Sequence, residues 1–128
     1  MRKAILILLL AVVSGNAGAG WANVGSNETT TVYVDPTIMR RKGNMVEMRY
    51  LVDFKTVQTM AGMSFISTTT QYEYDCKEEQ ARTLSLSFYA GNMGGGEVIH
   101  SDSHPSKWAP IPPGPIGERL RKLACGKP

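Results

Sequence analysis

Residues 45–54 read MVEMRYLVDF, and the spacing of apolar side chains in this stretch indicates a β-strand. Every second residue from Val46 to Phe54 is apolar, and most of the residues between them are charged. Leu51 is the exception. A period of two places alternate side chains on opposite faces of a strand. The stretch therefore predicts a strand with one face packed on a core and the other facing water.

The same alternation recurs along the middle of the chain. Residues 64–75 and 83–89 show it clearly, residues 29–34 and 97–100 are shorter candidates, and residues 37–40 are a further short one. Turns rich in glycine, asparagine and charged residues separate these runs. Short connections favour antiparallel pairing, because parallel strands need long crossover connections. The sequence therefore predicts an antiparallel sheet.

The C-terminal stretch 115–126, PIGERLRKLACG, has the period of a helix instead. Pro115 suits the first helical turn, where a missing N–H costs nothing, and Gly126 is a natural end. The apolar residues fall on one stripe: Ile116, Leu120, Leu123 and Ala124. A sheet with an uncovered apolar face and a helix with an apolar stripe predict an α+β domain in which the helix packs on the sheet.

The chain has two cysteines, Cys76 at the end of a predicted strand and Cys125 at the end of the predicted helix. Two cysteines allow one intramolecular disulfide, and such a bond persists in an oxidising compartment. In the chain-entropy model a loop of this length contributes about 4 kcal/mol of stability. The alternative, a redox or catalytic thiol, is less favoured because there is no C-x-x-C spacing.

The N-terminal residues 1–19, MRKAILILLLAVVSGNAGA, have the three regions of a secretory signal peptide. Two basic residues precede the apolar run 4–13, which is too short to cross a bilayer, since a helix needs ~20 residues for that. The segment ends in the small residues of Ala17-Gly18-Ala19. We therefore expect cleavage after Ala19, a single exported domain over residues 20–128, no membrane span, and no lipid anchor, because no cysteine lies near the cut.

The charge of the expected mature chain gives no indication of a nucleic-acid partner. Arg2 and Lys3 account for two of the 14 basic residues, so the remaining ones nearly balance the 11 acidic residues. Nucleic-acid-binding domains are commonly strongly basic. The run Arg40-Arg41-Lys42 is a local exception, which we interpret as a solvated turn.

A set of short motifs in a fixed order resembles the surface-adhesin protein E-like domains of bacterial exported proteins. The motifs are Trp21, 32–35 (VYVD), 72–76 (YEYDC), Arg82, Tyr89, Met93-Gly94 with Gly96, Trp108, 111–114 (IPPG) and Cys125. The resemblance implies a curved antiparallel sheet of about six strands, with a C-terminal helix tied to it by the cysteine pair. It also implies a protein partner, such as a host-matrix or envelope component, and a possible homodimer, because the name-giving protein is a matrix-binding adhesin that dimerises.

The chain departs from this family pattern at three points. It lacks an acylated cysteine, Arg49 stands where relatives have an aromatic residue, and Pro115 replaces the usual serine before the helix. The missing lipid argues most directly against an adhesin held on the outer surface, because nothing obvious retains the protein on the cell. The expected location is periplasmic, or secreted or at the cell surface.

His100, Asp102 and His104 are the candidates for a metal site. In an extended chain these i, i+2 and i+4 side chains project to one side, where they would form three ligands. The surrounding stretch HSDSHPS is polar and precedes Pro105, so a solvated loop is the favoured interpretation. We expect no metal, no cofactor and no catalytic residues.

Aromatic residues are the candidates for recognition, because they contribute disproportionately to interface energy. Tyr50, Tyr72 and Tyr74 lie on the predicted inner faces, where core packing is the default. The binding candidates are therefore Trp21, Tyr33 and Trp108.

Three functions follow from these patterns. The first is an exported, non-enzymatic binding module resembling surface-adhesin protein E. The second is a periplasmic accessory or envelope-stress protein that binds a small ligand or a peptide against the sheet. The third and least favoured is a metal-dependent hydrolase built around His100 and His104.

Overall fold

The computed structural model describes residues 20–126, so the predicted signal peptide 1–19 lies outside the described residues. The strands are β1 (Ala22–Ser26), β2 (Thr30–Val34), β3 (Arg40–Lys42), β4 (Met45–Met60), β5 (Met63–Asp75), β6 (Gln80–Tyr89), β7 (Val98–Asp102) and β8 (Ala109–Pro110). The helices are η1 (Pro36–Ile38), η2 (Asn92–Gly94) and the C-terminal helix α2 (Pro115–Cys125), of which η1 and η2 are 3-10 turns. None of these helices is long and apolar enough to cross a membrane.

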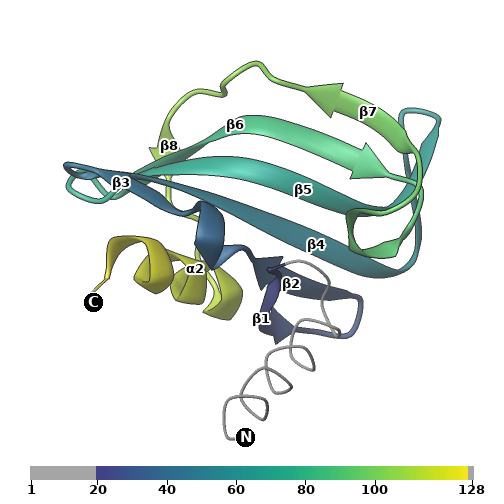
Figure 1. The fold of residues 1–128 in the computed structure, drawn as a ribbon, viewed down its shortest axis with the longest axis horizontal. Coiled ribbons are helices and arrows are strands. Elements are labelled where there is room, and N and C mark those ends of the chain that lie inside the picture. The colour runs from purple at the N-terminus through teal and green to yellow at the C-terminus, as the bar shows by residue number, and fades with distance from the viewer. Residues whose placement is uncertain (1–19, 127–128) are drawn as a thin grey trace, which may run out of the picture.

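All of the strand pairs in this part of the chain are antiparallel, as the short connections predicted. Six strands form the main path, in the order β1-β2-β4-β5-β6-β7, while the short strands β3 and β8 pair with β4 and β6. Figure 1 shows a curved, open sheet with α2 lying against one side of it. The predicted α+β architecture is confirmed.

Two local predictions were wrong. Residues 37–40 were expected to be a strand, but Pro36–Ile38 form η1, and β3 begins at Arg40. Asp35 explains the difference, because its Oδ1 atom accepts a hydrogen bond of 3.1 Å from the backbone N–H of Thr37 and so caps a turn. Strand β4 also runs to Met60, beyond the predicted end at Phe54, with an irregularity in its pairing between Asp53 and Gln58.

The main core lies between α2 and the sheet. The alternating residues of the central strands supply one side of it, with Met48 and Tyr74 at 0% and 1% exposure, and Leu120 and Ala124 of α2 supply the other. Cys76 and Cys125 form a disulfide whose Cα atoms are 5.5 Å apart. The predicted bond therefore fastens the end of the helix to the end of β5.

A second buried region lies on the opposite side of the sheet. The loop around η2 folds back over β4 and β5, where the Oγ atom of Ser67 donates to the carbonyl oxygen of Gly91 at 2.6 Å and accepts from the N–H of Gly94 at 2.9 Å. Leu51 lies beneath this loop with no exposed surface. Its apolar character, which broke the alternation in the sequence, is thereby explained.

Candidate binding face

We call the side of the sheet that faces away from α2 the outer face. Its membership follows from the register, because residues directly opposite each other in neighbouring strands project to the same side. Glu47 pairs with Glu73, which pairs in turn with Arg82, and Arg49 pairs with Gln71. These polar side chains alternate with the core residues of the same strands, so they form a continuous polar row across β4, β5 and β6.

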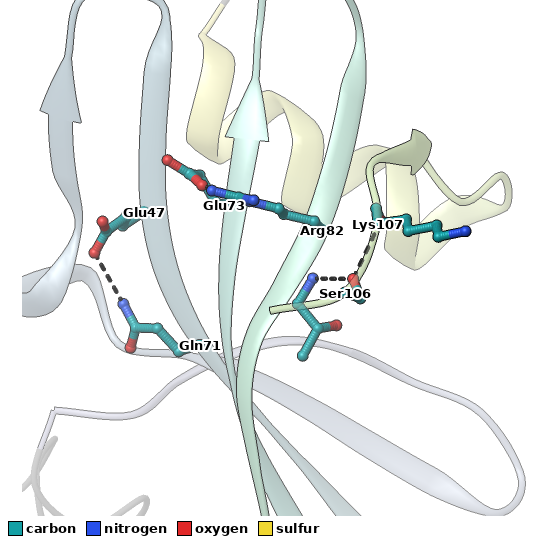
Figure 2. A network of polar contacts seen from close by, with 7 residues as sticks. Glu47, Gln71, Glu73, Arg82, Ser106 and Lys107 are labelled. Carbon is teal, nitrogen blue, oxygen red and sulfur yellow. Dashed lines mark hydrogen bonds and ion pairs between the residues drawn. The ribbon is translucent and has the colours of Figure 1, made fainter. Parts of the chain in front are cut away.

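Contacts between side chains order this row. The Nε atom of Arg82 lies 2.9 Å from Oε1 of Glu73, and the amide of Gln71 donates a hydrogen bond of 3.4 Å to Glu47 (Figure 2). The side chain of Glu73 is only 14% exposed and that of Arg82 is 31% exposed. A paired carboxylate at this depth is held in place, since an unpaired one would lose its solvation without compensation.

A tryptophan lies at each end of the polar row. The guanidinium carbon of Arg49 lies 5.2 Å from the ring centroid of Trp21, and that of Arg82 lies 4.6 Å from the centroid of Trp108. Both distances fall within the range of cation–π attraction. Each indole is thus fixed against an arginine while remaining partly exposed.

The segment before β8 positions Trp108. The N–H of Thr83 donates to Oγ of Ser106 at 3.0 Å, and the N–H of Ser106 donates to the carbonyl oxygen of Thr83 at 2.8 Å. Figure 2 shows Ser106 beside β6. These two hydrogen bonds hold the connection that follows β7 against β6 at Thr83. Trp108 therefore reaches the outer face from a segment far from Trp21 in the sequence.

Residues 21–126 match the model of the family described as surface-adhesin protein E. The chain belongs to that family. No curated protein matches the chain.

Solved structures of protein E share the fold of this adhesin E-family chain. Crystal form II of Haemophilus influenzae protein E is 12% identical with a TM-score of 0.63, and the match covers 84% of this chain and 87% of that one. Protein E from non-typeable Haemophilus influenzae is also 12% identical, with a TM-score of 0.61 and coverage of 84% and 76%. At identities this low the matches show a common fold and do not show what this chain binds.

The three residues predicted for binding lie on the outer face of this adhesin E-family domain. Tyr33 pairs in register with Leu51, which lies on that face, and Trp21 and Trp108 contact its arginines. Arg82 and Glu73, which pair on this face, were not among the residues predicted for binding, although both lie at polar positions of alternating strands. The alternation itself was the available signal, because it assigns these residues to the face opposite the core.

The tyrosines predicted for the core of the adhesin E-family domain do pack there. Tyr72 makes edge-to-face contacts with Tyr50 at 5.5 Å and with Tyr74 at 5.2 Å, measured between ring centroids. Burial raises the pKa of Tyr50 and of Tyr74 above the usual tyrosine value. The rings line a cavity of about 200 Å³ beneath the start of α2.

The geometry gives no support to a metal site at His100, Asp102 and His104. Asp102 Oδ1 lies 2.7 Å from His104 Nδ1, a hydrogen bond that lowers the pKa of the carboxyl group. The His100 ring packs beside Phe88 instead, with a centroid separation of 6.1 Å. Among residues 20–126, no group of three histidine, cysteine or acidic side chains is arranged to hold a metal ion.

Proposed function

We propose that this chain is an exported, non-enzymatic binding module that uses its outer face to bind a protein partner. The observation that carries this proposal is the pair of arginine–tryptophan stacks at the two ends of the polar row. Tryptophan and arginine are the residues most enriched at the energetic centres of protein interfaces. Here both kinds are concentrated on one face of one sheet.

The outer face suits a partner because its side chains are already ordered. Arg82 contacts both Glu73 and Trp108, so its guanidinium has little freedom left to lose when a partner binds. Preorganisation of this kind raises affinity by lowering the entropy cost of association. The polar row also offers hydrogen-bond donors and acceptors to the backbone and side chains of a protein.

The charges of the face favour a partner surface that is polar and close to neutral. Two arginines and two glutamates balance one another along the row: Arg49, Arg82, Glu47 and Glu73. Arg40 of β3, which pairs in register with Glu47 on the same face, adds a single positive charge. A face that bound polyanions would carry an excess of basic residues. A host-matrix protein or an envelope protein meets this requirement, whereas a nucleic acid does not.

Family membership and the predicted signal peptide support the location and the kind of activity. The family is described as a surface adhesin, and one of the similar solved structures is protein E of Haemophilus influenzae. The Cys76–Cys125 disulfide agrees with an oxidising compartment. We therefore propose export to the periplasm or the cell surface.

A binding screen tests the proposal. Exported protein is immobilised and presented with purified host-matrix glycoproteins and with envelope extract, and every captured protein is measured again with Trp21→Ala and Trp108→Ala. The control is Met60→Ala, because Met60 is 50% exposed on the β4–β5 hairpin, outside the polar row.

We expect each tryptophan variant to weaken binding by about tenfold or more, as for interface hot spots, and the Met60 variant to bind normally. A captured partner that binds the parent, both tryptophan variants and the Met60 variant equally well would contradict the assignment of the binding site to the outer face. Light scattering tests whether the partner is a second copy of the chain. A dimer that forms in the parent and is lost in the tryptophan variants would support a homodimer interface on the outer face.

A further inference from the structure

The apolar stripe of α2 is wider than the surface that covers it. Leu120 and Ala124 are buried against the sheet, at 6% and 1% exposure, but Leu123 is 48% exposed. Leu123 belongs to the stripe that the sequence predicted, so its exposure is a local departure from the pattern. A single exposed leucine is ordinary on a protein surface, so the surroundings of Leu123 decide what its exposure means.

Leu123 borders an open groove of about 450 Å³ between α2 and the N-terminal strands. Val34 and Met39 form apolar walls on the side of the sheet and η1, and Leu123 forms the wall on the side of the helix. In Figure 1, α2 lies alongside β1 and β2 at this point. The volume lies within the range of small-molecule sites, about 300–1,000 Å³.

The charges that line the groove are all positive. Arg119 and Lys122 project from α2 at its border, and no acidic residue is among the described residues that line it. The polar end of a ligand that fits this groove should therefore be an anion. An apolar wall with cations at its border is the complement of an amphiphile with a negatively charged head.

The position of Arg119 is fixed by the fold. Its Nη1 atom donates a hydrogen bond of 2.6 Å to the carbonyl oxygen of Val24. Gly25 makes this approach possible, because a Cβ atom there would lie 2.7 Å from Nη1 of Arg119. A guanidinium carries five N–H donors, so one bond to Val24 leaves others for a ligand.

We propose that this groove binds a free fatty acid. The acyl chain lies against Val34, Met39 and Leu123, and the carboxylate pairs with Arg119 and Lys122. Burial of methylene groups supplies the main driving force, and the two cations select the carboxylate head. The flexible side chain of Met39 adapts to such a chain. This inference does not rest on the outer face.

The experiment measures binding of dodecanoate to the exported, disulfide-bonded protein by calorimetry, below the concentration at which micelles form. Dodecanol and dodecyltrimethylammonium serve as probes with the same chain and a neutral or cationic head. The variants are Leu123→Asp and Lys122→Gln. Their matched controls are Val57→Asp and Lys55→Gln on the distant part of β4, where Val57 is 62% exposed.

We expect Leu123→Asp to weaken dodecanoate binding at least tenfold and Lys122→Gln to weaken it about threefold, whereas both controls bind normally. Dodecanol should bind about tenfold more weakly than dodecanoate, and the cationic probe more weakly still. Absence of dodecanoate binding, or binding unchanged by Leu123→Asp, would overturn the proposal.

A flotation assay with phosphatidylglycerol vesicles separates a free fatty acid from a membrane lipid. We expect no co-flotation of the protein. The contrary result would be co-flotation of the parent that is lost in Leu123→Asp, with no binding of dodecanoate in solution. That result would show that the groove docks on a lipid surface, and it would overturn the assignment of a free fatty acid. Neither result depends on the variants of Trp21 and Trp108.

Discussion

The carbonyl oxygen of Pro112 occupies the space beside Gly117 that any larger residue would need for its Cβ atom. Gly117 lies in the first turn of α2, and Pro112 belongs to the extended segment that leads into the helix. A glycine within a helix ordinarily lowers stability by about 1 kcal/mol relative to alanine. Its presence here is explained by the close approach of the preceding segment.

Replacement of this glycine should therefore destabilise the domain. We expect Gly117→Ala to lower the free energy of unfolding by about 1–3 kcal/mol, the usual cost of overpacking, although alanine is the better helix former. Urea unfolding monitored by circular dichroism measures the change. Glu118→Ala, in the same turn, loses an exposed ion pair with Arg121 and should cost less. An increase in stability for Gly117→Ala would contradict the contact.

Removal of the disulfide should weaken the attachment of α2. The bond closes a loop between residues 49 positions apart, for which the chain-entropy model gives about 4 kcal/mol. We expect the double variant Cys76→Ala/Cys125→Ala to lose that amount, measured by urea unfolding beside the oxidised parent. The hydrogen bond of 2.8 Å from Arg41 to the carbonyl oxygen of Ala124 remains in this variant. An unchanged urea midpoint of unfolding would show that α2 is held by packing and hydrogen bonds without help from the disulfide.

Loss of the Ser67 hydroxyl should release the loop that covers Leu51. Ser67 has no exposed surface and bonds to both Gly91 and Gly94. We expect Ser67→Ala to cost about 1–3 kcal/mol, because buried backbone groups lose their partner. Hydrogen exchange should show faster exchange at Gly94 and neighbouring amides, while β5 and β6 stay protected near Tyr74. Uniform acceleration across the sheet would contradict a local role.

The alternation of apolar and polar residues was enough to predict the sheet and its inner face, and the short connections predicted its antiparallel pairing. The alternation was not enough for β1, because the exposed residues Ala22 and Ser26 carry no clear period. It also failed at Pro36–Ile38, where a side-chain cap from Asp35 overrode the extended pattern. Local hydrogen bonds of this kind compete with strands without changing the hydrophobic period.

The candidate residues of the outer face were partly predictable. Aromatic character, combined with the predicted inner faces, selected Trp21, Tyr33 and Trp108, but not the arginines that contact the two indoles. Arg82 meets Trp108 only because the connection after β7 returns along the edge of β6 to form β8. Contacts between residues so far apart depend on the path of a loop, which residue periodicity does not encode.

The tyrosine cluster should make stability depend on alkaline pH. Burial raises the pKa of Tyr50 and of Tyr74 in the folded state above the reference value of 10.0. The folded state therefore holds these protons more tightly than the unfolded chain, so the contribution to stability is complete below pH 10 and is lost as the pH rises through the folded-state pKa values. We expect the free energy of unfolding to fall above about pH 10, and Tyr50→Phe to reduce the slope. A flat profile would contradict the burial of these hydroxyls.

Arg82 should contribute more to stability than an exposed arginine, because it pairs with a largely buried carboxylate and stacks on Trp108. We expect Arg82→Ala to cost about 1–3 kcal/mol, since Glu73 is left without its partner. Arg82→Lys keeps the charge but loses the planar group that contacts both neighbours, so it should recover only part of the loss. A double-mutant cycle of Arg82→Ala with Trp108→Ala isolates the stacking energy, expected at about 0.5–1 kcal/mol. Urea unfolding of the parent, the two single variants and the double variant measures this coupling energy. A value of zero would show that the Trp108 ring and the Arg82 guanidinium do not attract each other. Stacking on Trp108 could then no longer be counted as preorganising Arg82 for binding.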